Sequence, residues 1–259
     1  PCCNVRSFHS GLGKGGGLFV WSASGAKASH NGGTIIDPAK AAGIAAWPGA
    51  YFTPAGSGSG VWMRIGETVS PSMFGAKVDV IGSPDSFTGT DDSAAFAAWI
   101  AAARSSKARA TLDPGIALVT KSQNWNGAGY ASEHAASVQV DGAGATRCAI
   151  YFVLTEAFPA IDMTDNGHGG LRDVLLVSCP GSLDKGTIFF GESAATYGSA
   201  VFLENVTVRV SAGVTGSLGG IVNGGCDQIR LSGAKAYSYA DGVPGLLVTK
   251  RNAPMLAAM

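Results

Sequence analysis

The chain has 259 residues, and its 18 basic and 18 acidic side chains give a formal net charge of zero. Charged residues make up 14% of the sequence, below the roughly 25% of an average soluble domain, and 38 residues are glycine. This balance excludes nucleic-acid binding through a basic stripe and also excludes a solvated acidic tail. Because 46% of the residues are apolar, disorder is not expected, and no apolar run is long enough for a membrane helix. We therefore expect a water-soluble, β-rich protein with no nucleic-acid partner and no membrane insertion.

The cysteines and the N-terminus indicate synthesis in a reducing compartment. The five cysteines, of which Cys2 and Cys3 are adjacent, form neither a disulfide framework nor a C-x-x-C pair. We expect free thiols, with no metal site and no cofactor. No charged-then-apolar leader is present, so no signal peptide is expected and Pro1 is interpreted as a trimmed start.

Residues 1–70 are predicted to form a small β-subdomain. Apolar patterns predict strands at Leu18–Trp21, Thr34–Ile36 and Val61–Ile65, with glycine turns between them. The run Gly11–Gly16 satisfies G-x-G-x-x-G, but no buried strand precedes it and a strand follows it instead of a helix. A phosphate-binding loop is therefore not expected.

One helix is predicted near the start of the second region, residues 71–259. Thr90 suits the N-cap, Asp91 and Asp92 suit the positive end of the helix dipole, and an alanine-rich sequence then runs to Ala103. One apolar stripe is formed by Phe96, Trp99, Ile100 and Ala103. The alternative, a metal-binding or catalytic carboxylate pair, is not required because capping explains both aspartates.

From Thr111 onward the sequence predicts short strands separated by glycine turns. Three of them, around Leu171, Leu203 and Cys226, share a polar pair followed by alternating apolar residues. Short strands repeated every few tens of residues are typical of solenoids and propellers. The spacing is irregular, and hairpin signals are scarce, which favours a parallel β-helix, whose turns can vary in length.

Roughly five coils of such a β-helix fit between Ser137 and Thr249. Both open ends of the stack need a cover, and the alanine-rich helix is suited to cap the first end. The tail Lys250–Met259 is too short to cap the other end. We therefore expect either an N-terminal portion of a longer chain or a cover supplied by neighbouring copies.

Three motifs follow one another in the middle of the chain: Phe74-Gly75-Ala76-Lys77, Thr90-Asp91-Asp92-Ser93-Ala94-Ala95-Phe96 and Leu112-Asp113-Pro114-Gly115-Ile116-Ala117-Leu118-Val119. Together they resemble the N-terminal signature of pectate-lyase-like right-handed β-helices. The upstream segments Gly15–Trp21, Asn31–Thr34 and Trp62–Arg64 are similar to the short domain that precedes this signature in bacteriophage tailspikes. In one departure, Val78-Asp79-Val80 stands where the family has Gly-Asp-Gly, and in another Ala117 stands where it often has Tyr.

The resemblance implies an all-β fold, in which a small β-subdomain and a capping helix precede a right-handed parallel β-helix. It also implies a homotrimeric virion protein of the phage tail, assembled in the host cytoplasm beside other tail or baseplate proteins. Such spikes recognise, and often depolymerise, bacterial surface polysaccharide. Two alternatives stay open: a non-catalytic virion structural or adaptor module, and a free-standing bacterial polysaccharide lyase or hydrolase. The lack of a leader peptide counts against the second.

Candidate catalytic carboxylates lie on the predicted coils. Glycoside hydrolysis uses two carboxylates on one face, about 5 to 10 Å apart. Asp173, Glu204 and Asp227 precede strands at comparable positions in the repeat, and we predict that they line up on one outer surface. The simpler alternative is a solvated strand edge. Whether the chain is a depolymerase stays open, because the catalytic residues of such an enzyme can lie outside this chain.

Candidate carbohydrate-binding residues lie on the long excursion Ser122–His134, which carries Trp125, Tyr130 and His134. Loops on a rigid scaffold often carry binding groups, and aromatic faces stack on sugar rings. Packing against a neighbouring subunit explains these side chains equally well.

Overall fold

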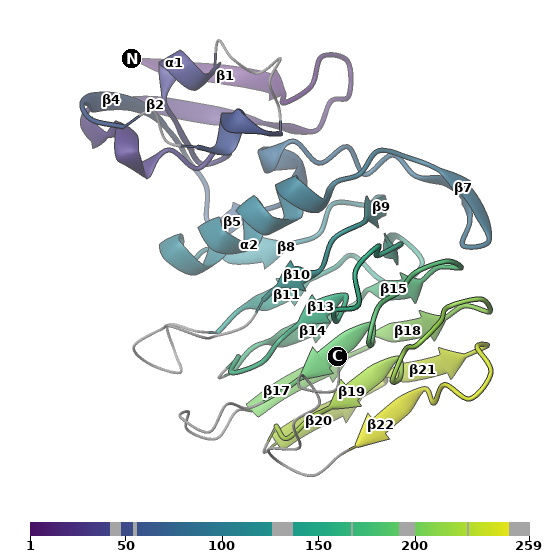
Figure 1. Ribbon diagram of the computed structural model, residues 1–259. Helices are drawn as coiled ribbons and strands as arrows, with labels where there is room; N and C mark the ends of the chain where they lie inside the picture. Colours follow the sequence, from purple (N-terminus) through teal and green to yellow (C-terminus); the bar gives the residue numbers. More distant parts are fainter. Residues whose placement is uncertain are drawn as a thin grey trace. The chain divides into compact units, whose positions relative to one another are not determined.

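The computed structural model describes residues 1–41, 48–53, 56–125, 137–166, 168–191, 200–226 and 228–248 (Figure 1). The chain divides into two compact units. The first comprises Pro1–Lys77 and Ala94–Thr111, and the second comprises Val78–Ser93 and the chain from Leu112 onward.

The first unit contains a four-stranded antiparallel sheet with strand order β1-β2-β4-β3. Its strands are β1 (Cys2–Ser7), β2 (Gly15–Ala26), β3 (Ile35–Ile36) and β4 (Ser59–Arg64). Phe19 and Val61 are buried, whereas Leu18 and Val20 are exposed, which is the alternation of a sheet with one solvated face. The three predicted strands are confirmed, and β1 is an additional strand. In the run Gly11–Gly16, the first four residues belong to the connection between the antiparallel strands β1 and β2, and Gly15 and Gly16 begin β2.

Among the described residues, one helix is long and the others are short. They are α1 (Pro38–Ala41), α2 (Ser93–Ser106) and the 3-10 turns η1 (Lys27–Ser29), η3 (Ala50–Phe52) and η4 (Pro71–Phe74). On α2, Phe96, Trp99 and Ile100 are at most 1% exposed, which confirms the predicted apolar stripe. The Nε1–H of Trp99 donates to the carbonyl of Val69 at 2.9 Å. Val69 lies on β5 (Thr68–Val69), which pairs in parallel with β8 (Arg109–Thr111).

The helix α2 starts at Ser93, two residues later than an N-cap at Thr90 predicts. Thr90 is not its N-cap, because the backbone N–H and the hydroxyl of Thr90 donate to Asp79 at 2.8 and 2.9 Å. Asp91 accepts the backbone N–H and the hydroxyl of Ser93 at 3.0 and 2.5 Å. Asp92 is fully buried and accepts a backbone N–H. Both aspartates therefore support the start of the helix, although not in the predicted frame.

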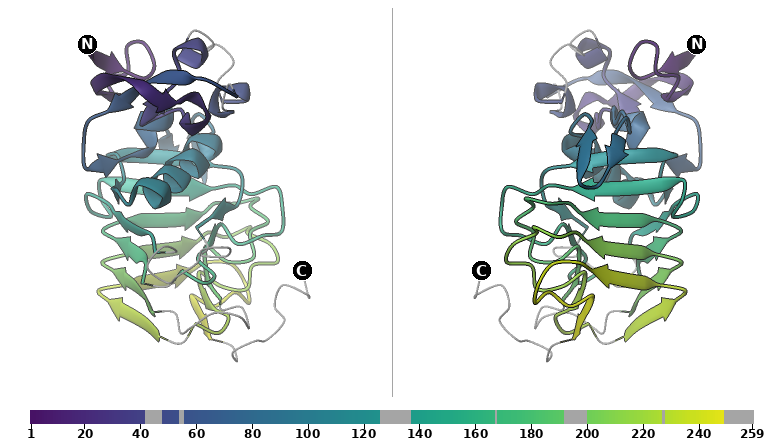
Figure 2. Two further views of the ribbon diagram at one scale, coloured as in Figure 1. Left: turned by 90° about the vertical axis from the view of Figure 1, so that its left-hand side faces the viewer. Right: turned by 90° about the vertical axis from the view of Figure 1, so that its right-hand side faces the viewer.

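The second unit is a parallel β-helix, as predicted. Its strands stack in three parallel sheets, with orders β10-β13-β16-β19-β22, β9-β12-β15-β18-β21 and β11-β14-β17-β20 (Figure 2). The strands are β9 (Gly115–Val119), β10 (Gln123–Asn124), β11 (Gln139–Asp141), β12 (Cys148–Phe152), β13 (Ile161–Asp162), β14 (Gly170–Arg172), β15 (Leu175–Ser178), β16 (Ile188–Phe190), β17 (Ala200–Glu204), β18 (Thr207–Val210), β19 (Ile221–Asn223), β20 (Gln228–Ser232), β21 (Lys235–Ser238) and β22 (Leu246–Val248). The described strands from β11 to β22 make four coils of three strands, instead of the roughly five that the sequence spacing suggests.

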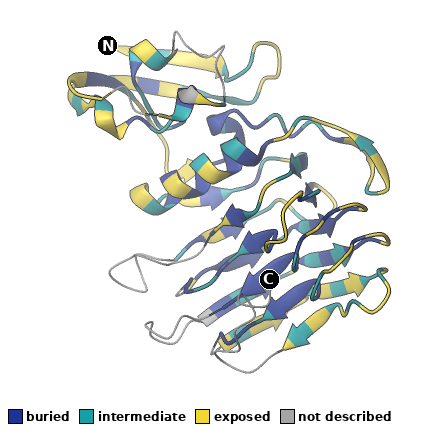
Figure 3. Ribbon diagram, in the orientation of Figure 1, coloured by how far each residue is buried: buried dark blue, intermediate teal, exposed yellow. Residues whose placement is uncertain are grey.

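The interior of the β-helix is a stack of aliphatic side chains in register. Val140, Leu171, Leu203 and Leu231 occupy equivalent positions on β11, β14, β17 and β20. The first three are 0% exposed, whereas Leu231, on the last described coil, is 43% exposed. Figure 3 shows this change from buried to exposed residues along the coils. Each inner coil is thus covered on both sides, as strands about 4.8 Å apart require.

In three of the four described coils, the corner between the first two strands uses a left-handed backbone. Asp173 and Asn205 both have a φ of 53°, and Gly233, at the equivalent position one coil further, has a φ of 62°. Asp and Asn tolerate this conformation better than other residues with side chains. The sequence predicts uninterrupted strands across Leu171–Ser178 and Ala200–Val210, but these corners divide each of them into two.

A short antiparallel hairpin, β6 (Ile81–Ser83) and β7 (Ser86–Thr88), covers part of the outer face of the β12-containing sheet. The ring of Phe87 packs edge-on against Tyr151 with centroids 5.3 Å apart. Val80 and Val177 are buried in the same cluster. At the hairpin tip, the carboxylate of Asp85 lies 3.5 Å from the guanidinium of Arg209.

The described helices include none with the length and apolarity needed to cross a membrane. All five cysteines are free, and three of them are buried.

Candidate functional site

The structure places the six predicted site residues in different settings. Trp125 is 0% exposed, so its ring has no free face for a sugar, and its burial fits a packing role. Tyr130, His134 and Asp227 lie outside the described residues. Asp173 and Glu204 lie on adjacent coils, where the N–H of Asp173 donates to the carbonyl of Glu204 at 3.0 Å.

Asp173 and Glu204 are not equivalent in the repeat, although the sequence pattern aligns them. The register pairs Glu204 with Arg172, one residue earlier, and Asp173 corresponds to Asn205 at the left-handed corner. The side-chain amide of Asn205 donates to the carboxylate of Asp173 at 3.2 Å. Asp173 lies at this corner, beyond the end of β14, whereas Glu204 lies on β17. The two carboxylates therefore do not form the predicted equivalent pair.

The register instead assembles a polar row on the outer face of the β14-containing sheet. Asp141, Arg172, Glu204 and Ser232 follow one another across β11, β14, β17 and β20. Nε of Arg172 donates to Oε2 of Glu204 at 2.9 Å, and Nη1 of Arg172 lies 3.7 Å from Oδ1 of Asp141. The side chains of Arg172 and Glu204 are 40% and 44% exposed, so both stay accessible from solvent.

A second outward row supplies an aromatic ring beside these charges. It contains Gly170, Phe202 and Arg230. A side chain at position 170 would overlap the carbonyl and the ring of Phe202, so glycine is needed for the ring to lie against β14. The guanidinium of Arg172 lies over the ring of Phe202, 4.6 Å from its centroid, and this contact fixes both side chains.

These two rows enclose a shallow hollow of about 100 Å³. It is lined by Arg172, Phe202, Leu203, Glu204, Arg230 and Ser232. The hollow combines an aromatic ring, an arginine held by a carboxylate, an exposed arginine and a hydroxyl. Such a set offers both a surface for sugar C–H groups and donors and acceptors for sugar hydroxyls.

The same geometry argues against hydrolysis by these carboxylates. Asp141 and Glu204 lie two strands apart, which corresponds to about 9 to 10 Å between their strands. That spacing is within reach of an inverting pair. However, Arg172 occupies the space between the two carboxylates, where the scissile bond and the water would have to lie. The arrangement is therefore suited to binding a sugar and not to cleaving it.

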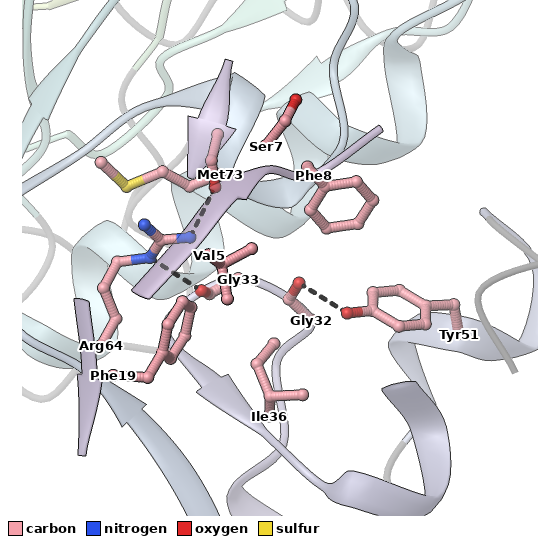
Figure 4. Close-up of a pocket in the computed structure, with 11 residues that line it drawn as sticks. Val5, Ser7, Phe8, Phe19, Gly32, Gly33, Ile36, Tyr51, Arg64 and Met73 are labelled. Atoms are coloured by element: carbon pink, nitrogen blue, oxygen red, sulfur yellow. Dashed lines mark hydrogen bonds between the residues drawn. The ribbon is translucent and has the colours of Figure 1, made fainter. Parts of the chain in front are cut away.

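The first unit contains a separate pocket of about 150 Å³ with a largely apolar lining (Figure 4). Its charged group, the guanidinium of Arg64, donates to the carbonyls of Gly15, Gly16 and Gly33 at 2.8, 2.5 and 3.0 Å. Burial lowers the pKa of Arg64 to about 10, and burial also raises the pKa of Tyr51 to about 12. The polar groups at this pocket serve the fold, and the space suits an apolar side chain.

Within the described residues, no group of three or more His, Cys, Asp or Glu side chains is arranged to hold a metal ion. Of the residues that line the hollow, the sequence analysis named only Glu204 as a candidate, because neighbours across this sheet lie 28 to 32 residues apart in the chain. The one available signal was the polar residue that ends each strand of this sheet.

Residues 2–67 match the family model of the phage tail protein small four-stranded beta-sheet domain, in agreement with the sheet observed there. None of the curated proteins matches the sequence.

The whole chain is similar in structure to phage tailspike proteins. Tailspike protein gp49 of the Acinetobacter baumannii bacteriophage Fri1, a capsular polysaccharide depolymerase, has a TM-score of 0.58 at 10% identity, over 98% of this chain and 47% of its own. The enzymatically active domain of bacteriophage CBA120 tailspike protein 2 has a TM-score of 0.56 at 13% identity, over 90% and 37%. The full-length tailspike protein 2 has a TM-score of 0.54 at 13% identity, over 92% and 31%.

The resemblance to phage tailspikes with a parallel β-helix is thereby confirmed. The chain spans less than half the length of each of these three proteins. At these identities the similarity shows the fold alone.

Proposed function

We propose that this chain is part of a phage tailspike and that it recognises a bacterial surface polysaccharide through the hollow around Phe202. The match of residues 2–67 supports a location in the phage tail. In this proposal the spike is a homotrimer, assembles in the host cytoplasm and joins other tail or baseplate proteins. The observation that carries the proposal is the hollow itself, which places an aromatic ring between two arginines and a carboxylate on an outer face.

The charges of the hollow support recognition of a polar, hydroxyl-rich polymer over an apolar ligand. Arg172 keeps its orientation through Glu204 and through the ring of Phe202. A preorganised donor loses little entropy when a ligand binds. The solvent-exposed side chain of Arg230 adds a further donor on the other side of the ring. The hollow lies on a flat sheet face and not in a deep cleft, which leaves room for a polymer to extend beyond it.

The test is binding of the full chain to a panel of purified capsular polysaccharides and lipopolysaccharide O-chains, measured by calorimetry. We expect one of them to bind, and we expect Phe202→Ala to weaken that binding at least fivefold. A nucleic-acid base gains about 1 to 3 kcal/mol by stacking on one aromatic side chain, and about 1 kcal/mol corresponds to fivefold. Arg230→Ala is expected to weaken it severalfold.

Matched controls are available elsewhere on the second unit. Phe158 is 49% exposed and Arg147 is exposed, and neither lines the hollow. Phe158→Ala and Arg147→Ala should leave binding unchanged, and circular dichroism should show all four variants folded. The proposal is overturned if no polysaccharide of the panel binds, or if Phe202→Ala and Phe158→Ala bind equally.

Cleavage is a separate question from recognition. Release of reducing ends or of unsaturated uronates from the bound polysaccharide would establish a depolymerase, with catalytic residues other than the Asp141 and Glu204 pair. Absence of both binding and cleavage would favour the non-catalytic structural or adaptor module.

A further inference from the structure

A different outer face of the β-helix, formed by β18 and β21, carries two exposed tyrosines. Tyr237 is 46% exposed and Tyr239 is 59% exposed. Along this strand Ala236 and Ser238 alternate with the tyrosines, and Ala236 is in register with the buried Val208. The tyrosines therefore point outward, away from the interior stack. They belong to the sheet with order β9-β12-β15-β18-β21, and not to the sheet that forms the hollow.

Part of this outer face is covered by the β6–β7 hairpin, and its outward side chains are buried there. Tyr151 occupies the same outward row as Tyr237, three coils away. Tyr151 is only 4% exposed, because Phe87 of the β6–β7 hairpin packs on it. The hairpin contacts this sheet as far as Arg209, which pairs with Asp85. Beyond Arg209 the tyrosines are open to solvent.

Arg209 connects the covered part of the face to the open part. It is in register with Tyr237, and its guanidinium lies 5.0 Å from the ring centroid of Tyr239. Nη2 of Arg209 lies 3.5 Å from the carboxylate of Asp85. The side chain is 32% exposed, so a ligand lying on the tyrosines can reach it. The hairpin thus holds the guanidinium of Arg209 beside the ring of Tyr239.

The charge on this surface is positive. Lys235 is exposed and lies on the same outward side of β21, in register with Thr207. Arg209 and Lys235 therefore contribute two positive charges to this surface, and Asp85 contributes one negative charge. Arginine binds carboxylates through paired, charge-assisted hydrogen bonds, and tyrosine rings stack on sugars through their faces. The combination of two rings and two cations suits a sugar that bears a carboxylate.

We propose that Arg209, Lys235, Tyr237 and Tyr239 form a second glycan-binding surface, specific for an acidic sugar residue such as a uronate. This proposal rests on the proposed function and specifies the substrate class. It assigns a surface on another sheet from the hollow, which neither the sequence motifs nor the similar proteins indicate. A polymer that contacts both surfaces gains affinity through effective concentration, without further contacts.

The experiment uses the full chain and galacturonate hexamers as the probe, with carboxyl-reduced hexamers as the neutral comparison. Binding is measured by saturation-transfer difference NMR. We expect the acidic hexamer to bind at least fivefold more tightly than the neutral one. The double variant Tyr237→Ala/Tyr239→Ala should lose at least fivefold in affinity for the acidic hexamer. Arg209→Gln should reduce the preference for the acidic over the neutral hexamer.

The conservative double variant Tyr237→Phe/Tyr239→Phe is the control, because it keeps both rings and should bind within twofold of the unaltered chain. Equal binding of the acidic hexamer by the double-alanine variant overturns the proposal, as does no binding by the unaltered chain. A change in sedimentation of the double-alanine variant, with hexamer binding unchanged, would also overturn it and indicate contact between copies of the chain. Failure of the proposed function is distinguishable, because it is measured separately, as polysaccharide binding that Phe202→Ala does not weaken.

Discussion

The interior of the β-helix and the interior of the small four-stranded sheet are held together by different kinds of contact. In the β-helix, aliphatic side chains at equivalent positions stack on one another, and Leu171 and Leu203 are both fully buried. In the small sheet, a single arginine, Arg64, joins β4 to three backbone carbonyls and lies over the ring of Phe19 at 4.6 Å. A repeat stabilises itself through register, whereas a small sheet of irregular loops depends on a few specific polar links.

The largest expected effect comes from the stack. Leu203→Ala removes a side chain that is covered by a coil on each side, and we expect a loss of about 3 kcal/mol in the free energy of unfolding. Leu231→Ala at the equivalent position of the last described coil should cost less than about 1 kcal/mol, because that side chain is 43% exposed. Chemical denaturation of both variants measures the difference. Equal losses would show that Leu231 is covered in solution and would contradict the comparison.

The second effect concerns the small sheet. Arg64→Met keeps the aliphatic part of the side chain but leaves the carbonyls of Gly15, Gly16 and Gly33 without their charged donor. We expect local stability to fall by about 2 kcal/mol. Hydrogen exchange of the amides in residues 2–64 measures the loss in that unit separately from the β-helix.

The matched control is Arg6→Met, at an exposed position on β1 of the same sheet. Its amide exchange should stay within about 0.5 kcal/mol of the unaltered chain. If both variants exchange alike, the arginine network is not what holds the small sheet together.

The third effect separates backbone strain from burial. Val78 has a φ of 51°, which is costly for a β-branched residue, whereas Val80 does not have a positive φ. Both side chains are 7% exposed. Glycine at either position loses the same burial, but only Val78→Gly relieves the strain. We therefore expect Val80→Gly to be less stable than Val78→Gly by about 1 to 2 kcal/mol. Equal stability of the two variants in denaturation would exclude strain at Val78.

Val78 also shows how much of the fold can be predicted from the sequence. The signature that this sequence resembles has glycine at this position, and the backbone here is left-handed although the residue is valine. The N–H of Val78 is held by the buried carboxylate of Asp92 at 3.0 Å, and local propensity does not reveal such a contact. The parallel β-helix itself was predictable, because alternating apolar residues and glycine turns recur along the chain.

The hollow was not predictable in the same way. Its members come from neighbouring coils, and the number of residues between coils changes from 32 to 28 across this sheet. A sequence without a fixed period does not specify the register between strands. The sequence pattern therefore aligns Asp173 with Glu204, whereas in the structure the partner of Glu204 is Arg172. The corner residues Asp173 and Asn205 set the register, and their left-handed conformation is visible only in the folded backbone.

The smallest expected effect concerns the pH dependence of stability that buried titratable side chains cause. The small sheet keeps the charge of Arg64 by surrounding it with carbonyls. The β-helix contains a buried carboxyl, Asp184, which accepts hydrogen bonds from Ser182 and the N–H of Gly186 at 2.7 and 3.2 Å. Burial raises the pKa of Asp184 despite these bonds. Near the start of α2, the pKa of Asp91 is lowered, because hydrogen bonds from Ser93 and Thr120 together outweigh the opposing effect of burial.

These two shifts have opposite consequences for stability. A raised pKa means that the folded chain holds the Asp184 proton more tightly than the unfolded chain. The contribution of Asp184 is therefore fully present below the unfolded pKa of about 3.9 and is lost as the pH rises through the folded value. The contribution of Asp91 is present above the unfolded value and is lost as the pH falls through the folded one. Asp184→Asn should thus flatten the fall in stability above about pH 4, and Asp91→Asn should flatten the fall in acid. Chemical denaturation across a pH series measures the free energy of unfolding of each variant and of the unaltered chain. If the curves of stability against pH have the same slope for Asp184→Asn and the unaltered chain, the β-helix interior tolerates the charge of Asp184 as well as the small sheet tolerates that of Arg64.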